Sequence, residues 1–203
     1  LSNSTEPTQS VTWTWSANEE ATYRHVVNQN ATWAFMDEPF NATNSTGLSG
    51  ADGTWYLHVQ ARDTANNTSP VSTVFALLDS TPPVAEIHGI PSSPTNSTTA
   101  SLTINGTDVE LYKWTLDDPE WSNATEVNAS LELTDLSEGQ HTLAIIGRDQ
   151  AGNWQPKANA TQVQWEVDTI PPVIFGLANA TEPAQSATWT WSSNENATFR
   201  HAV

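Results

Sequence analysis

Apolar and polar residues alternate along several stretches of the chain, as in a β-strand with one buried face. In the segment 55–61, Trp, Leu, Val and Ala occupy every second position, and Tyr, His and Gln stand between them. The segments 11–15 and 162–167 alternate in the same way. No stretch shows the 3.6-residue period of an amphipathic helix. The pattern therefore predicts an all-β protein.

Short turn signals such as Ala51-Asp-Gly, Asn105-Gly and Ser137-Glu-Gly separate the alternating segments. In the middle of the chain the pattern predicts seven strands, at 84–88, 98–105, 109–116, 120–123, 128–134, 141–149 and 162–168. Seven short antiparallel strands in about 88 residues are typical of an immunoglobulin-like β-sandwich.

The two ends of the chain carry the same sequence. Residues 1–27 and 177–203 lie 176 positions apart and are identical at 19 of 27 positions. A weaker repeat relates residues 52–63 (DGTWYLHVQARD) to residues 138–149 (EGQHTLAIIGRD), 86 positions later. The basic unit is therefore a module of about 88 residues, and the longer period contains two unlike modules, A and B.

This repeat predicts three segments. Residues 1–78 are a module A without its first strand, residues 79–167 are a complete module B, and residues 168–203 are the start of the next module A. Because the module front DTIPPVIFG has no counterpart before Leu1, we expect the chain to be cut out of register with its modules. Each predicted boundary carries a Pro-Pro pair, which stiffens the linker and favours an extended rod.

Two motifs carry a resemblance to a known family. Asp79-Ser-Thr-Pro-Pro and Asp168-Thr-Ile-Pro-Pro open the modules, and the segment 143–153 (LAIIGRDQAGN) ends in Asp-X-Ala-Gly-Asn. The chain resembles the bacterial-type immunoglobulin-like tandem repeats of large extracellular, adhesin-like proteins. Module A departs from the motif, with Asp63-Thr-Ala-Asn-Asn in its place. The resemblance implies an immunoglobulin-like fold, an extracellular setting and a spacer role.

Composition narrows the classes of function. The chain has 6 Lys and Arg against 23 Asp and Glu, a formal net charge of -17, which argues against nucleic acid as a partner. It has no Cys, so disulfides and thiolate metal sites are excluded, and no apolar run long enough for a membrane span in this segment. We expect no cofactor apart from covalent N-glycans, with calcium as a weaker possibility.

Sequons are the most distinctive chemical feature. Of 17 Asn, 13 begin Asn-X-Ser/Thr, whereas about four would do so by chance at this Ser and Thr content. The predicted glycosylation sites are Asn3, Asn30, Asn41, Asn44, Asn66, Asn67, Asn96, Asn105, Asn123, Asn128, Asn159, Asn179 and Asn196. Asn66 and Asn67 overlap, so crowding should leave only one of them glycosylated. This density predicts a secreted protein whose sugars coat most of its surface.

Further residues are candidates for binding or catalysis. Paired Trp residues on predicted strands are best explained as core, whereas loop-like positions are candidates for stacking on sugars: Trp33, Trp121 and Trp154. Carboxylates that recur near the module boundaries are weak calcium candidates, although turn capping is the commoner use: Asp63, Asp79, Asp149 and Asp168. The five His match no catalytic motif, and the acidic run 117–120 fits a solvated turn. We expect no enzyme.

The sequence therefore favours the shaft of a densely N-glycosylated extracellular fibril or surface filament. Its partners would be neighbouring repeats or copies of the same fibril, and neighbouring copies could be joined by strand addition. The alternative is the stalk of a cell-surface adhesin that binds carbohydrate.

Overall fold

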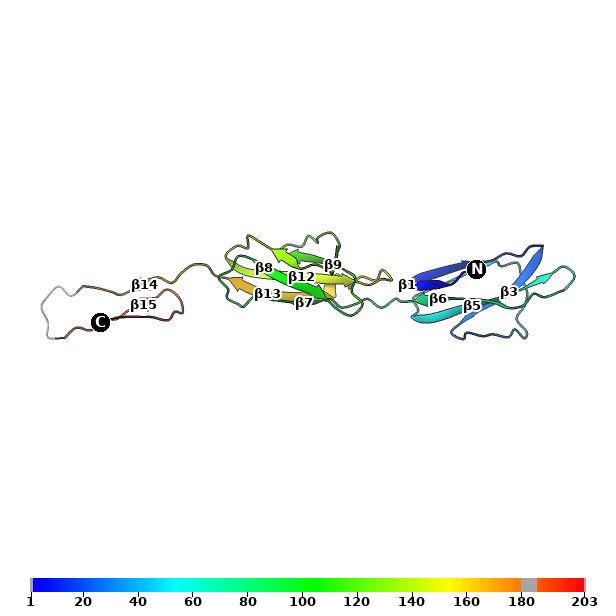
Figure 1. Ribbon diagram of the computed structural model, residues 1–203, viewed down its shortest axis with the longest axis horizontal. Coiled ribbons are helices and arrows are strands. Elements are labelled where there is room, and N and C mark those ends of the chain that lie inside the picture. The colour runs from blue at the N-terminus through cyan, green and yellow to red at the C-terminus, as the bar shows by residue number, and fades with distance from the viewer. Residues whose placement is uncertain (1, 180–185, 203) are drawn as a thin grey trace.

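The computed structural model describes residues 2–179 and 186–202 of the 203-residue chain. These residues form two β-sandwich modules and a third, smaller two-stranded unit, which follow one another along a single long axis (Figure 1). The all-β, tandem-sandwich fold predicted from the alternating pattern and the repeat is confirmed.

The first module packs a four-stranded sheet against a two-stranded sheet. The larger sheet contains, in spatial order, β1 (Ser4–Thr8), β6 (Ser72–Leu78), β5 (Gly53–Asp63) and β3 (Ala21–Asn28). β1 is parallel to β6, and the other pairs are antiparallel. The smaller sheet pairs β2 (Ser10–Thr14) with β4 (Ser45–Ser49).

The core of the first module is built around the period-two Trp pair. Trp13 and Trp15 are 4% and 7% exposed, and they pack with Tyr23 from β3 and Leu57 from β5. Thr12 and Thr14, which alternate with these Trp residues, stay exposed on the outer face, because successive side chains of a strand point to opposite faces. The core interpretation of these two Trp residues therefore agrees with the structure.

The second module has two sheets of four and three strands. The larger contains β10 (Thr125–Glu126), β9 (Leu111–Leu116), β12 (Gly139–Arg148) and β13 (Thr161–Val167). The smaller contains β11 (Leu131–Leu133), β8 (Ala100–Asn105) and β7 (Glu86–His88). A short 3₁₀-helix, Lys157–Asn159, precedes β13. Trp165 and Tyr112 are fully buried between the sheets and dominate the core by volume.

Six of the seven strands predicted for this module are found within a few residues of their expected places, and the strand predicted at 120–123 is wrong. The pairing partner of β9 is instead Thr125–Glu126. Ser122 donates its backbone N–H to the Trp114 carbonyl at 2.8 Å, but its hydroxyl, and not its backbone carbonyl, accepts the Trp114 N–H at 3.0 Å. A side chain thus replaces one rung of the ladder.

The third segment is a short two-stranded unit. β14 (Ile174–Phe175) pairs with β15 (Ser192–Ser193) in antiparallel fashion. Trp189 and Trp191, the sequence counterparts of the buried Trp pair in module A, are 54% and 36% exposed. The predicted range of this segment, 168–203, includes residues 180–185 and 203, which lie outside the described residues.

Candidate functional site

The asparagines that begin sequons share one structural property. All thirteen are exposed, and they lie in loops, in turns, at strand ends or, for Asn159, at the end of the 3₁₀-helix. Of the four asparagines that begin no sequon, Asn18 and Asn194 are also exposed, Asn28 is half-buried and Asn153 is buried. Exposure is what a bulky, hydrated glycan requires of its attachment site. The fold therefore leaves every predicted attachment site accessible, on both β-sandwich modules and on the third segment.

The overlapping sequons lie in a tight turn that follows β5. Asn66 has a backbone φ of 71°, a left-handed conformation that asparagine tolerates better than most residues. The next residue, Asn67, is tied back to Asp63: its backbone N–H donates to Oδ1 at 2.7 Å and its Nδ2 donates to Oδ2 at 2.8 Å. These bonds hold the pKa of the Asp63 carboxyl below its ordinary value. The two neighbouring amides thus have different surroundings.

Module B contains the same turn after β12, at the joint with module A. Asn153 donates its backbone N–H to Asp149 Oδ1 at 2.8 Å and its Nδ2 to Asp149 Oδ2 at 2.9 Å. Its second Nδ2 hydrogen goes to the backbone carbonyl of Asp79, at 3.0 Å, where the first module ends. Gly152, with φ of 97°, occupies the position equivalent to Asn66. The Asp-X-Ala-Gly-Asn motif is therefore a turn that also fastens one module to the next.

A second device recurs at both joints. At the first joint, the Asp52 carboxylate accepts hydrogen bonds from the backbone N–H and hydroxyl of Ser80 and from the hydroxyl of Thr81, all at 2.6 Å. At the second, Glu138 accepts the backbone N–H of Thr169 at 2.9 Å and its hydroxyl at 2.8 Å. Asp52 and Glu138 occupy equivalent repeat positions, 86 residues apart. At each joint, a carboxylate directly before a long strand, Asp52 before β5 or Glu138 before β12, thus accepts hydrogen bonds from the linker.

These linker contacts also shift the two carboxyl groups. The hydrogen bonds from Ser80 and Thr81 hold the pKa of Asp52 below its ordinary value of 3.8. Those from Thr169 hold the pKa of Glu138 below its ordinary value of 4.5. Both joints are therefore stabilised by an ionised acid.

The four calcium candidates are placed at turns and linkers, where their oxygens already accept protein hydrogen bonds. Asp63 and Asp149 bind the asparagine that closes their turns, and Asp79 and Asp168 accept the backbone N–H two residues later. Within residues 2–179 and 186–202, no three His, Asp or Glu side chains gather closely enough to hold a metal ion. Calcium binding has no further support from this geometry.

The three Trp residues proposed for sugar stacking are all half-buried. The ring of Trp121 faces Lys157 Nζ at 5.5 Å, and that of Trp154 faces Lys113 Nζ at 5.0 Å, both within cation–π range. Trp33 stacks on His58 at 6.3 Å between ring centroids and lines a broad surface pocket together with the sequon residue Asn30. Trp33 is therefore the candidate that shares a surface pocket with a predicted sugar attachment site.

Sequence reasoning missed one buried polar cluster. His141 is 3% exposed; its Nδ1 lies 2.6 Å from Asp117 Oδ2 and its Nε2 lies 2.8 Å from the Ser137 carbonyl. Burial lowers the pKa of His141, but these hydrogen bonds outweigh it and leave the pKa above 6.5. Asp117 also accepts the Thr142 backbone N–H, so it does more than end a solvated turn. Nothing in the sequence around His141 or in the acidic run 117–120 indicates that His141 and Asp117 lie in contact.

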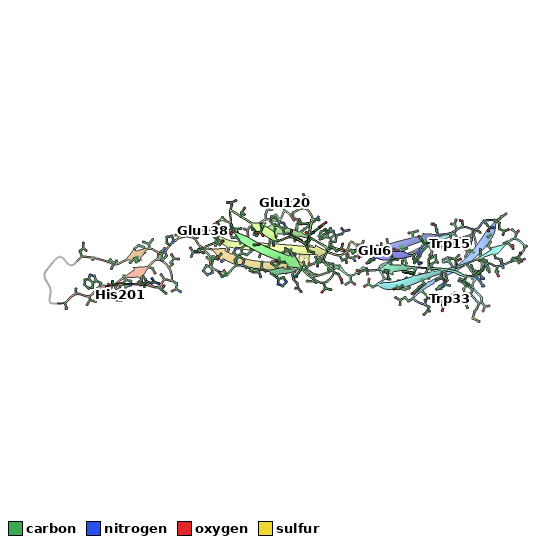
Figure 2. All side chains as sticks on the ribbon, viewed as in Figure 1. Glu6, Trp15, Trp33, Glu120, Glu138 and His201 are labelled. Atoms are coloured by element: carbon green, nitrogen blue, oxygen red, sulfur yellow. The ribbon has the colours of Figure 1, made fainter. Side chains whose placement is uncertain are left out.

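No helix among the described residues has the length and apolar character needed to cross a membrane. Figure 2 shows the side chains along the whole length of the elongated all-β chain.

Comparisons with known proteins show no family for this chain. No protein-family model matches the chain, and no curated protein matches it. Among solved structures, fibronectin(III)-like modules of Clostridium thermocellum CbhA match at 14% identity and a TM-score of 0.41, over 82% of this chain and 90% of that one. The FN1–FN3 domains of chicken CNTN1 match at 11% identity and a TM-score of 0.39, over 81% and 66%. The chain is described by its own topology, as two β-sandwich modules in tandem followed by a two-stranded unit.

Proposed function

We propose that the chain is part of the structural shaft of a densely N-glycosylated extracellular fibril or surface filament, with no enzymatic role. The observation that carries this proposal is that all thirteen sequon asparagines are exposed. Thirteen sequons among 17 asparagines exceed the about four expected by chance, and none of them begins at Asn28 or Asn153, the two asparagines that are not exposed. The proposal also places the chain outside the cell, because N-glycans are added on the secretory route.

The joints support a rod-like role. Each carries a carboxylate that caps the linker, and the first is also fastened by Asn153. Prolines follow directly at both joints and restrict the linker further. Repeats that contact mainly their neighbours build length in proportion to their number. Such a chain suits a shaft, and the adhesin-like repeats that it resembles serve as spacers.

A glycan coat would serve this shaft in a specific way. Edge strands present unpaired backbone groups that invite pairing with other chains. β4 and β10 each have one ladder partner within the described part of the chain, and Asn44 and Asn123 lie just before them. Sugars at these positions would shield the strand edges from lateral aggregation and the loops from proteases.

Glycopeptide mass spectrometry of the native protein tests the proposal directly. We expect hexose-bearing peptides at most sequons and a fall in apparent mass of many kilodaltons after enzymatic or chemical removal of N-glycans. Chemical release covers glycans that an Asn-glycosidase does not cleave. If the sequon peptides are found unmodified at full yield, the glycosylated-shaft proposal is wrong.

A second candidate function is carbohydrate binding at the stalk of an adhesin. The pocket around Trp33, with Asp37 and Glu38 on its rim, favours it. A glycan array probed with the unglycosylated chain would show binding that is lost in Trp33→Ala and kept in Trp121→Ala, whose ring is already covered by a lysine. An array without binding removes this candidate.

A further inference from the structure

The loop between β3 and β4 forms a broad surface pocket that is lined by both a sequon asparagine and a tryptophan. Its volume is about 900 Å³, and its lining includes Asn30, Trp33, Met36, Asp37 and Glu38. Sites for small molecules commonly have volumes of about 300–1,000 Å³. A glycan attached at Asn30 would therefore begin at the wall of a space that is large enough to hold sugar residues.

One buried side chain fixes Asn30 and Trp33 relative to each other. The Nε2 of His58, which is fully buried, lies 3.0 Å from the Asn30 carbonyl oxygen, and the His58 ring stacks on Trp33 at 6.3 Å between centroids and 27° between planes. Its Nδ1 lies 2.9 Å from Thr73 Oγ1 on β6, which holds the imidazole in this orientation. Asn28 Oδ1 accepts the Asn30 backbone N–H at 2.8 Å. The backbone of Asn30 is thus held at both of its polar groups, beside a ring that the same histidine supports.

Arg24 on β3 holds the other part of the loop against the sheet. Its guanidinium carbon lies 4.8 Å from the ring centroid of Phe35 and 4.7 Å from that of Phe40, both within cation–π range. Its Nε and Nη2 donate to Gln60 Oε1 on β5 at 2.9 and 2.7 Å. The loop is therefore packed on the strands below it, and the pocket is formed before any ligand enters.

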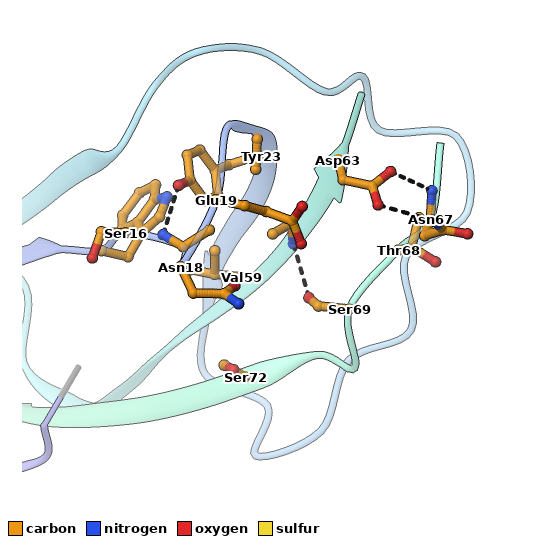
Figure 3. A pocket seen from close by; sticks show the side chains of 14 residues that line it. Ser16, Asn18, Glu19, Tyr23, Val59, Asp63, Asn67, Thr68, Ser69 and Ser72 are labelled. Atoms are coloured by element: carbon orange, nitrogen blue, oxygen red, sulfur yellow. Dashed lines mark hydrogen bonds between the residues drawn. The ribbon is translucent and has the colours of Figure 1, made fainter. Parts of the chain in front are cut away.

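The side-chain amide of Asn30 is available for glycosylation. The residue is exposed, and no other described residue forms a hydrogen bond with this amide. Figure 3 shows a contrasting case in the same module, a pocket of about 440 Å³ that is also lined by a sequon asparagine and an aromatic ring, Asn67 and Tyr23. There the amide of Asn67 donates to Asp63 at 2.8 Å. Asn30 therefore combines a pocket with a free amide, which Asn67 does not.

The lining of the pocket suits a neutral sugar. Met36 is 83% exposed and, with the accessible part of Trp33, gives an apolar surface on which the C–H face of a sugar ring can pack. Asp37 and Glu38 supply carboxylate oxygens that can accept hydrogen bonds from sugar hydroxyls. The backbone N–H groups of Glu38 and Met36 hold the pKa of the Glu38 carboxyl below its ordinary value of 4.5, so it is ionised at neutral pH. The same charges would repel an acidic sugar.

We propose that the glycan on Asn30 folds back over Trp33, and that its sugars nearest to the asparagine occupy this pocket. One sugar ring packs on the indole, and hydroxyl groups donate to Asp37 and Glu38. The inference rests on the proposed function, because it requires a glycan on Asn30. It gives one glycan of the coat a fixed position on the surface of module A.

The covalent attachment favours this sugar over a free one. A ligand joined to its site through a short flexible connection has an effective concentration of about a millimolar. A contact that would be too weak to hold a free sugar is therefore filled by an attached one. In the glycosylated chain, a foreign carbohydrate would first have to displace the glycan of Asn30 from the pocket.

Hydroxyl-radical footprinting read by peptide mass spectrometry tests the site on the chain secreted by a host that glycosylates it. Trp33 and Met36, which is the one methionine of the chain, are the reporters. We expect both to be oxidised about two- to ten-fold faster in Asn30→Gln, the factor for losing a ring contact of ordinary aromatic strength. Asn44→Gln is the matched control, because it removes an exposed sequon of the same loop outside the pocket lining and should leave both rates unchanged.

A pair of substitutions at Thr32 separates the loss of the sugar from the loss of the asparagine. Thr32→Ala removes the acceptor sequon, whereas Thr32→Ser keeps it at the same position. We expect Thr32→Ala to reproduce the faster oxidation of Asn30→Gln, and Thr32→Ser to behave like the unaltered chain.

Glycopeptide mapping of the same samples distinguishes this site from the proposed shaft. Sugar on Asn30 together with equal oxidation of Trp33 and Met36 in Asn30→Gln and in the unaltered chain would overturn the site and leave the glycosylated shaft intact. An unmodified Asn30 among other sequons that carry sugar would also overturn the site alone. Sequons that carry no sugar at all would overturn both.

Discussion

Replacing Asn153 with alanine is expected to destabilise module B and loosen its joint with module A. The side chain is 8% exposed, and its Nδ2 makes two hydrogen bonds, at 2.9 Å to the Asp149 carboxylate and at 3.0 Å to the Asp79 carbonyl. A bond to a charged group contributes about 1.5–3 kcal/mol and a neutral one about 0.5–1.5 kcal/mol. We therefore expect a loss of about 2–4 kcal/mol in the free energy of unfolding of module B.

Hydrogen exchange measured peptide by peptide in increasing urea reads the two modules separately and is the assay of choice. It is done on unglycosylated protein, so that sugars do not contribute. The matched control is Asn67→Ala, which removes the same turn bond in module A from an exposed side chain without the joint bond. The reasoning is refuted if Asn153→Ala changes the stability of module B by less than about 0.5 kcal/mol, which is typical of a neutral surface substitution.

Three further predictions concern pH and glycan placement. Because the pKa values of Asp52 and Glu138 are lowered in the folded chain, their contribution to the joints is complete above pH 4.5 and is lost as the pH falls through the folded values, which lie below the ordinary 3.8 and 4.5. Small-angle X-ray scattering should show the rod becoming flexible in that range; a rod unchanged at pH 2.5 contradicts this. The pKa of His141 is raised, so its contribution to stability is complete below pH 6.5 and lost as pH rises through the folded value. The melting temperature of module B should therefore fall from pH 6 to 9, and His141→Gln should remove that fall. Glycopeptide mapping should place the sugar of the overlapping sequons on Asn66, because the Nδ2 of Asn67 is held by its turn; a sugar mainly on Asn67 would show that the turn does not select the site.

The sequence predicts the fold of this chain well because the signals are local and repeated. Alternation along 55–61 and 162–167 identifies β5 and β13, and the repeat relates module A to module B before any contact is known. The strand at 120–123 was mispredicted because the hydroxyl of Ser122 takes a place in the ladder, and a pattern of apolar and polar residues does not encode which group accepts a hydrogen bond.

The joints were only partly predictable. The recurrence of Asp63 and Asp149 near the module boundaries indicates that these two residues have a shared role, and the sequence favours turn capping as that role. That Asn153 also reaches across to Asp79 depends on the angle between two modules, which no local pattern contains. The pairing of His141 with Asp117 is long-range for the same reason: the two residues meet through the register of β9 and β12.

The measurement that tests the central claim most directly is a cryo-electron microscopy map of the native assembly, at a resolution that shows both the backbone and attached sugars. The account predicts a rod in which paired β-sandwich modules repeat every 176 residues, with branched density extending from the exposed sequon asparagines. A globular particle, or a rod whose sequon asparagines carry no density beyond the side chain, would contradict it.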